Sequence, residues 1–511
     1  MGCEKHKIDS NITGLFIAEE ECLKSLSASP IWRGIEPNSY SDLGGSLTQV
    51  KRETINPSRQ SKKGVIVDMD ATAGFTVDMT KNIFSWLMQG FMFADAREKT
   101  STSPISGETI KITDVDTTTY NLETSLKKAP LIGSLIYASG FNSLANNGVK
   151  TVTESTPVSI TVSGSLVSEL KPPSNSCIHV VGMKFGVGEC NFILNAGERP
   201  KLIITSDSIK FTDLGLTLGE RIFIGGDGTN ARFKNNVGYA RIESISDAEL
   251  MFDDTTFTPV SEIGDGISLE IYFGSVIRNE SEQEKIITRS YCIERTLGAD
   301  DKGIQAQYVN GAVANELTLN CSTASLVTAD MSYIACSTTN KKGGERLAGM
   351  RLPLDATDAF NTSSNIYLQK LSIIDGQNTN PKPLFGYVTE ATISISNNVS
   401  GLKALSILGS FDVSVGNFDV SGSLTAMFST VDAIEAIKNN ADVGLLSIFA
   451  AKNTGIIFDI PLLSLGGGML NVEKDQAITI PLEQTGAENK HGYTLMYQQF
   501  NYLPDIAMPL N

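Results

Sequence analysis

Apolar and polar residues alternate along much of the chain. Between residues 65 and 79 every odd position is apolar, whereas Asp68, Asp70 and Asp78 are among the polar residues at even positions. A period of two predicts a strand with one buried face. Similar runs recur throughout the sequence, separated by Gly, Asn, Asp and Pro. The pattern therefore predicts a mainly β protein.

Two segments have helical spacing instead. From Lys81 to about Ala94, apolar residues recur at intervals of three and four, and Thr80 is placed to cap the start. A shorter helix is predicted from Val431 to Asn439, with Ser429 or Thr430 at its N-cap. We therefore expect one or two helices beside the strands.

Residues 142–167 and 230–257 share a pattern. In each, an Asn-Asn turn precedes an alternating strand, a turn and a second alternating strand. Each stretch is typical of one hairpin of a small barrel or sandwich. The similarity favours two related β modules, although Asn-Asn turns before Val- and Thr-rich strands are common enough for coincidence.

The segment "SFDVSVGNFDVSGSL" predicts the sharpest hairpin of the chain. A two-residue loop at Gly416-Asn417 would pair Val415 with Phe418 and Val413 with Val420, which places the apolar side chains on one face. The opposite, polar face would then hold Asp412, Ser414, Asp419, Ser421 and Ser423.

Length and composition narrow the possible classes of function. The 511 residues suggest about three domains. With 57 acidic against 41 basic residues, the net charge of -16 argues against a surface that grips nucleic acid. The most apolar stretch, residues 84–94, is too short to span a membrane. Seven scattered cysteines predict reduced thiols in a protein made in the cytosol.

No pattern of catalytic or metal-binding residues is convincing. Cys177, His179 and Cys190 could be offered as zinc ligands, but buried or idle side chains explain them better. The glycine-rich residues 225–230 are typical of a turn rather than a calcium site. The acid pairs Asp253-Asp254 and Asp300-Asp301 are expected to be loop acids, because neighbours on a strand point to opposite faces and cannot share a substrate. We predict no catalytic residue, cofactor or metal.

One segment of this acidic chain is basic. It contains Lys51, Arg52, Arg59, Lys62 and Lys63 but no aromatic residue that could stack on bases. Two interpretations stay open, a solvated loop or a subunit-contact loop that pairs with an acidic surface of a neighbouring copy.

The order of these pieces resembles a known family. "SPIWRGIEPNSYSDLGGSLTQVKRETINPSRQSKKG", an alternating acidic strand and "TKNIFSWLMQGFMF" resemble the opening of the tail tube (major tail) proteins of long-tailed bacteriophages. "SYCIERTLG", "GAVANELTLNCSTASLVTADMSYIAC" and the strands from "VTEATISISNNV" to "GNFDVSGSLTAMF" resemble the rest. The resemblance covers about residues 29–96 and 286–503. We therefore expect tube-core parts at 1–121 and 279–511, and an inserted β domain at 122–278.

The resemblance implies a β-sandwich subunit with a flanking helix, a structural protein of the virion tail made in the host bacterial cytoplasm. Its copies would form six-fold rings that stack into a tube, with other tail proteins as partners and no membrane contact. Viral DNA would pass through without specific binding, and the acid excess suits such a conduit. A closed ring would also cover exposed strand edges. The inserted domain is expected on the outer surface.

For the channel lining, the resemblance favours the polar face at Asp412, Ser414, Asp419 and Ser421. The strand with Asp68, Asp70 and Asp78 competes for this role, and either set could merely keep a strand soluble. Two other classes of protein stay open. A β-rich host-binding fibre or adhesin should show tandem repeats, and a glycan hydrolase needs two carboxylates across a cleft.

Overall fold

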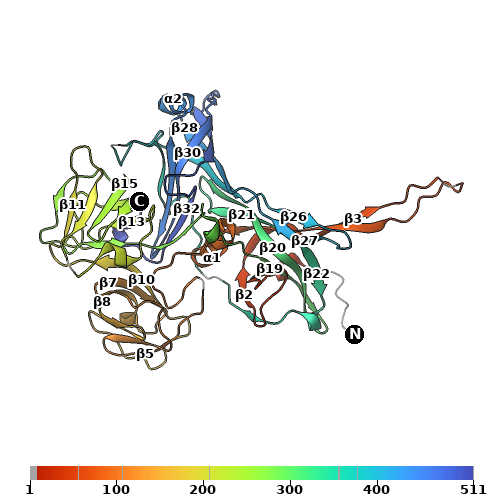
Figure 1. Ribbon diagram of the computed structural model, residues 1–511, viewed down its shortest axis with the longest axis horizontal. Helices are drawn as coiled ribbons and strands as arrows, with labels where there is room; N and C mark the ends of the chain where they lie inside the picture. Colours follow the sequence, from red (N-terminus) through yellow and green to blue (C-terminus); the bar gives the residue numbers. More distant parts are fainter. Residues whose placement is uncertain are drawn as a thin grey trace.

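The computed structural model describes residues 8–509, apart from positions 56, 106, 207, 355, 356 and 377. Most of the described elements are antiparallel strands in two large sheets, together with two α-helices (Figure 1). The prediction of a mainly β protein is therefore confirmed. Neither helix is long and apolar enough to pass through a lipid bilayer, as far as the described residues show.

The larger sheet forms the core of the subunit and is built from both ends of the chain. Its first strands are β1 (Leu15–Glu19), β2 (Ile31–Ile35), β3 (Pro37–Val50), β4 (Val65–Asp78), β18 (Ser275–Arg278), β19 (Tyr291–Asp300), β20 (Gly303–Ser322) and β21 (Thr328–Ala335). The later ones are β22 (Ser337–Lys341), β23 (Met350–Arg351), β24 (Ile366–Ile373), β25 (Val388–Ser396), β28 (Asp419–Met427), β29 (Val443–Ala451), β30 (Thr454–Gly467), β31 (Thr479–Gly486) and β32 (Met496–Phe500).

Helix α1 (Lys81–Met92) is buried between two parts of this sheet. Phe84 contacts Phe458 of β30 and Tyr497 of β32, whereas Phe91 contacts Tyr333 of β21. The strands thus enclose one apolar core in a β-sandwich, as the resemblance implies. Thr80 occupies the N-cap position as expected, but its side chain makes no capping hydrogen bond.

The shorter helix, α2 (Asp432–Lys438), lies against β30 at one end of the core. Its N-cap is Val431 rather than Ser429 or Thr430. The Thr430 hydroxyl instead donates a hydrogen bond to the Asp432 carboxylate at 2.9 Å.

The expected hairpin around Gly416-Asn417 is wrong. Strand β27 (Ser410–Ser414) pairs with β26 (Ser400–Lys403) in a separate two-stranded sheet, whereas β28 pairs with β25 and β31. The alternation was read correctly in β28, where Val420 is buried and Asp419 is exposed, but in β27 the apolar Phe411 is 41% exposed. Both strands also have other partners than expected. Long strands on both sides of β28 offer it more backbone hydrogen bonds than the five-residue β27 can.

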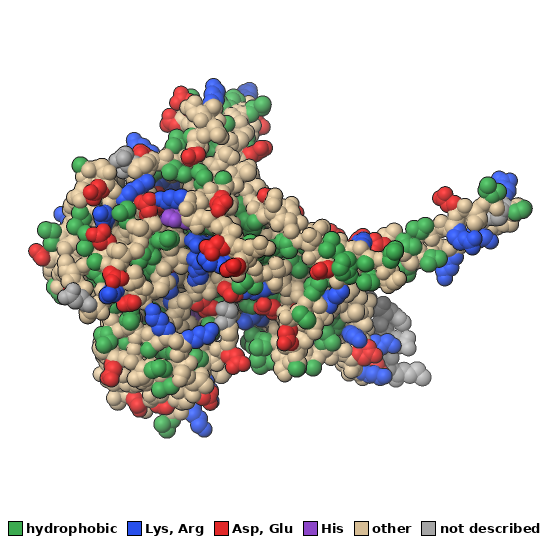
Figure 2. Space-filling view, viewed as in Figure 1, with side chains coloured by type: hydrophobic (Ala, Val, Ile, Leu, Met, Phe, Trp, Pro, Cys, Tyr) green, Lys and Arg blue, Asp and Glu red, His purple; other side chains and the backbone are tan. Residues whose placement is uncertain are grey.

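Strands β3 and β4 form a hairpin that extends far beyond the core (Figure 1). We call residues 46–68 the arm. All described side chains from 46 to 63 are exposed, and the basic segment forms its tip. Lys and Arg side chains gather at that tip (Figure 2).

The second sheet comprises residues 112–272 and begins ahead of the expected boundary at 122. Its strands are β5 (Ile112–Val115), β6 (Thr119–Leu122), β7 (Ser134–Ser139), β8 (Gly148–Thr156), β9 (Ser159–Val162), β10 (Cys177–Lys184), β11 (Cys190–Ile193), β12 (Lys201–Ile204), β13 (Arg221–Ile224), β14 (Gly238–Ile245), β15 (Glu249–Thr255), β16 (Glu262–Ile263) and β17 (Glu270–Tyr272). Two separate apolar clusters lie within it, one near β5–β9 and one near β11–β17. We call this part the inserted domain.

Both shared-pattern stretches form hairpins, β8–β9 and β14–β15. Each hairpin is bracketed by the same contact, which we call the Asn clamp. A fully buried Asn before the hairpin accepts a hydrogen bond from the backbone N–H of a Val after it and donates to the C=O of the same Val. The Asn amide also donates to the carboxylate of a Glu two residues after that Val. The triplets are Asn146, Val167 and Glu169, and Asn236, Val260 and Glu262. The clamps join each Asn-Asn turn to the chain beyond its hairpin.

The inserted domain packs on the core through a mixed junction. Apolar residues of the domain, including Phe223 and Tyr239, share a buried cluster with Ile448 of β29 and Ile457 of β30. Beside it lies Asp459, whose side chain is 3% exposed. Its carboxylate pairs with Arg221 at 2.8 Å and Arg241 at 3.2 Å, both from the inserted domain.

Candidate functional site

Six neighbouring core strands, β4, β21, β20, β25, β28 and β31, present one continuous polar face. Their apolar residues point into the core, and cross-strand rows of short polar side chains cover the other side. One such row runs through Thr76, Asp330, Thr318, Ser394, Ser421 and Thr485. We call this surface the polar face.

Side chains of neighbouring strands are hydrogen-bonded to one another across the polar face. Asp330 accepts bonds from Thr76 at 2.5 Å and from Asn320 at 2.8 Å. The hydroxyls of Thr392 and Ser423 lie 3.0 Å apart. Much of this surface therefore consists of short side chains that are hydrogen-bonded to their neighbours.

The polar face carries acids but no bases. Its acidic residues are Asp78, Glu316, Asp330, Glu390, Asp419 and Glu483. Among the described residues, none of these six carboxylates takes part in an ion pair, and no Lys or Arg stands at an outward position of the six strands. The face is therefore a uniformly acidic surface.

The predicted lining residues divide between this face and elsewhere. Asp78, Asp419, Ser421 and Ser423 are on it, brought together from two separate strands, β4 and β28. Asp412 and Ser414 belong to the separate strand β27.

The predicted acids Asp68 and Asp70 stand at the base of the arm. Both carboxylates pair with the Lys403 ammonium, at 2.6 Å for Asp70. The pKa of Asp68 is lowered by this hydrogen bond. These two acids therefore have a cation of their own chain, unlike the acids of the polar face.

Sequence reasoning missed Glu316, Asp330, Glu390 and Glu483. A signal was available, because the alternation that buries Leu317 and Leu319 also turns Glu316 outward. Alternation does not show the register between strands, and without the register the four acids cannot be assigned to one shared surface.

The five cations of the basic segment, which was predicted to be either a solvated loop or a subunit-contact loop, are Lys51, Arg52, Arg59, Lys62 and Lys63. All of them are exposed at the tip of the arm. None of them pairs with a carboxylate among the residues that the structure describes. The loop is thus a cluster of positive charge held far from the acidic body of the subunit (Figure 2).

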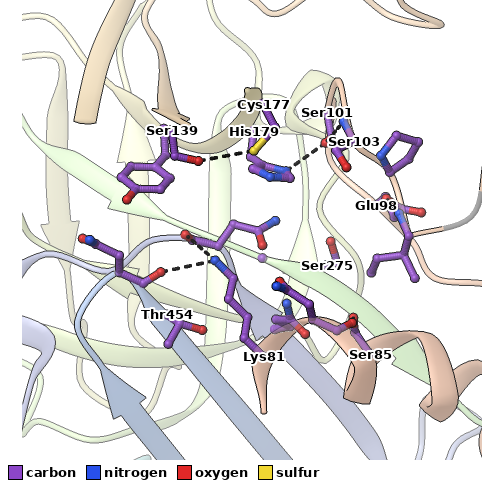
Figure 3. A pocket seen from close by; sticks show the side chains of 18 of the residues that line it. Lys81, Ser85, Glu98, Ser101, Ser103, Ser139, Cys177, His179, Ser275 and Thr454 are labelled. Carbon is purple, nitrogen blue, oxygen red and sulfur yellow. Dashed lines mark hydrogen bonds between the residues drawn. The ribbon is translucent and has the colours of Figure 1, made fainter. Parts of the chain in front are cut away.

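A polar cavity of about 800 Å³ lies between α1, the core and the inserted domain (Figure 3). Cys177 and His179 line it, but their nearest polar partners are hydroxyls, Ser139 at 3.3 Å and Ser101 at 2.8 Å. Burial, with nearby Lys81, lowers the pKa of His179 to about 3, so the imidazole is neutral. Cys190 lies away in the apolar cluster of β11–β17. No group of three or more potential metal ligands occurs among the described residues.

The acid pairs take structural positions. Asp253 and Asp254 are strand residues of β15, not loop acids, and a bulge between β14 and β15 lets both reach the junction network. Asp253 pairs with Arg241 at 2.7 Å, and Asp254 with Arg221 at 2.5 Å. Asp300 accepts backbone hydrogen bonds that lower its pKa.

Comparison with known proteins gives one result. A family model described as phage tail tube protein matches residues 10–486, which is nearly the whole chain and includes the inserted domain. No curated protein matches the chain.

Proposed function

The chain belongs to the phage tail tube protein family, and from this premise we propose that its copies form six-fold rings, stacked into a tube whose channel is lined by the polar face. The family is a structural one of the virion tail, whose members assemble with themselves and with other tail proteins. We propose no enzymatic activity and no cofactor for this member.

The polar face supports this proposal because its chemistry suits a surface past which DNA must slide. Duplex DNA carries one negative charge per about 1.7 Å of its axis, so Lys and Arg on a channel wall would hold it. The face offers six acids, many hydroxyls and no cation among its described residues. Many of its side chains are also short and hydrogen-bonded to one another, as at Asp330 and at Thr392 with Ser423.

The experiment reverses charge on the polar face and measures delivery. Glu316→Lys/Asp419→Lys places two cations on the face at exposed positions. The matched control, Glu154→Lys/Asp265→Lys, makes the same change in charge on exposed positions of the inserted domain. Both variants are supplied as the only copy of the chain during phage growth. Tail assembly is scored by electron microscopy, and genome delivery is measured at low and high salt.

We expect normal tails from both variants but slowed delivery from the first, most strongly at low salt, since each phosphate contact adds about one unit to the salt slope of DNA binding. Unchanged delivery at both salt concentrations would exclude the polar face from the channel. A third variant, Asp412→Lys, shows whether strand β27 also faces the channel. A chain absent from the tail shaft would refute the tube role itself.

For the inserted domain we propose a place on the outer surface of the tube. It joins the core through β29 and β30, and its apolar clusters lie within the domain itself. For the arm we propose a contact with another copy, because its cations have no partner among the described residues of their own chain.

A further inference from the structure

The arm carries an apolar stripe that its own subunit leaves uncovered. Along β4 the residues Met69, Ala71, Ala73, Phe75 and Val77 all point into the core. Beyond Met69 a register shift in the hairpin interrupts this row, and the next apolar residues, Val67 and Val65, are 52% and 63% exposed. Val50 pairs with Val65 across the hairpin and is 55% exposed. The apolar residues of this hairpin therefore continue beyond the core, where their own subunit leaves them exposed.

A second uncovered surface lies at the opposite end of the core. We define the α2 end as Tyr387, residues 427–438 and residues 468–478. Backbone bonds hold these segments together, from Met427 to Tyr387 and from Phe428 to Ile478, both at 2.9 Å. Met469 is 82% exposed, and the other exposed apolar residues there are Tyr387, Met427, Val431, Val472 and Ile478.

The two surfaces carry opposite charges. The arm has its five cations and two acids, Glu53 and Asp68, and Asp68 at its base pairs with Lys403. The exposed acids of the α2 end are Asp432, Glu435, Glu473 and Asp475, against the cations Lys438 and Lys474. In the described part of the chain, none of these four acids forms an ion pair. Each surface thus combines bare apolar side chains with unpaired charge, positive on the arm and negative at the α2 end.

The strand directions place the two surfaces at opposite ends of the sheet. In the cross-strand rows, Asp78 lies level with Thr328 and Asn320, toward the end of β28 that leads into α2. The arm leaves β4 at the other end of the strand, beyond Met69. In a head-to-tail stack of identical subunits, the arm end of one copy faces the α2 end of the next.

We propose that the arm of one copy docks on the α2 end of a second copy in the adjoining ring. The valine stripe covers the exposed Met and Val side chains, and the basic tip pairs with the acids of the α2 end. This inference rests on the proposed tube function and adds the acceptor surface for the arm. Contacts of this heterologous kind repeat without closing and therefore build a filament of rings.

The test uses two charge-reversed chains that are each unable to stack but complement one another. The arm variant is Lys51→Glu/Arg52→Glu/Lys62→Glu/Lys63→Glu, and the α2-end variant is Glu435→Lys/Glu473→Lys. All six side chains are exposed, so folding should be unaffected. Four samples are tested during tail assembly. They are the arm variant, the α2-end variant, a mixture of the two, and one chain that carries all six substitutions. Tubes are counted by electron microscopy, with Glu154→Lys/Asp265→Lys as the control partner for the arm variant.

We expect each single variant to give at least tenfold fewer tubes than the natural chain, because like charges then face each other at every ring contact. Mixing the two, or combining them in one chain, should restore tubes to within about twofold, and the control partner should not. Raising the salt should reduce the defect of the single variants.

Tubes from the arm variant alone, or no rescue by the α2-end variant, would overturn the assigned contact. Failure of the proposed function looks different, since the natural chain would then be missing from tail shafts. A cysteine pair, Arg59→Cys with Glu473→Cys, gives a second measurement, because docking predicts a disulfide between copies in assembled tails and none in dispersed subunits.

Discussion

The arm and the inserted domain both extend from the same core, yet their charged residues differ in burial and in ion pairing. At the junction of the inserted domain, Arg221 and Arg241 are buried against Asp459, beside the apolar cluster that the domain shares with the core. On the arm, the five cations of the tip have no partner among the described residues, and the valine stripe is open to water.

The junction of the inserted domain is complete within one subunit, whereas the arm has the surface of a contact that needs a second molecule. Buried charges must be paired, so the junction forms whenever the chain folds. Exposed charge beside exposed apolar surface is typical of an interface with a partner. The inserted domain is therefore a fixed part of the subunit, and the arm is the part through which we propose that subunits meet.

The largest expected effect follows from removing the inserted domain. Arg97 and Val276 bond at 2.7 Å, so a short Gly/Ser linker can replace residues 99–274. The plain deletion uncovers the apolar cluster on β29 and β30 and leaves Asp459 without its arginines, and we expect an insoluble chain. A repaired deletion with Ile448→Thr, Ile457→Thr and Asp459→Ser should be soluble.

Electron microscopy of the repaired chain then tests the outer position. Intact rings are expected, because the polar face and the arm are unchanged. If circular dichroism shows that the repaired chain is folded but no rings form, the inserted domain is part of the tube wall.

The next effect concerns the junction charges. Asp459→Ala removes the carboxylate shared by Arg221 and Arg241 and leaves two guanidinium groups short of a partner in a buried site. Breaking a buried pair in this way costs about 3–5 kcal/mol of unfolding free energy. Urea unfolding measures the loss, and Asp442→Ala, at an exposed acid of the same core, should change it by less than about 0.5 kcal/mol. Equal losses for both would mean that the junction is not tightly closed.

Acid should weaken the same junction. Burial alone would raise the pKa of Asp253, but Arg241, with help from Lys490 and Arg221, outweighs it and holds the pKa below the usual 3.8. A carboxyl with a lowered pKa in the folded state stabilises the fold at higher pH, and this stability is lost as the pH falls through the folded-state pKa. The stability difference between the natural chain and Asp253→Asn should therefore be constant from pH 7 to about 5 and shrink below pH 4. A difference independent of pH would show that Asp253 is not ionised in the junction.

Much of the fold was predictable from alternation, because a period of two reports which face of a strand is buried. It identified β4 and its buried face, and helical spacing identified α1. The shared Asn clamps also support the prediction of two related modules. Pairing partners were not predictable, because the alternation of β28 is compatible with pairing to either β27 or β25. Which of the two is its partner depends on the other strands of the sheet. The junction was missed for the same reason, as Arg221 and Asp459 are far apart in sequence.

The smallest expected effect is on the arm in an isolated subunit. Lys51, Arg52, Lys62 and Lys63 are exposed and have no ion pair with a described residue, so reversing their charge removes no contact within the chain. Substitutions at such sites usually change the unfolding free energy by less than about 0.5 kcal/mol. Urea unfolding of the dispersed arm variant should therefore match the natural chain, although its tubes are lost. A clearly destabilised subunit would mean that the tip is held by its own chain, and the contrast between the arm and the inserted domain would disappear.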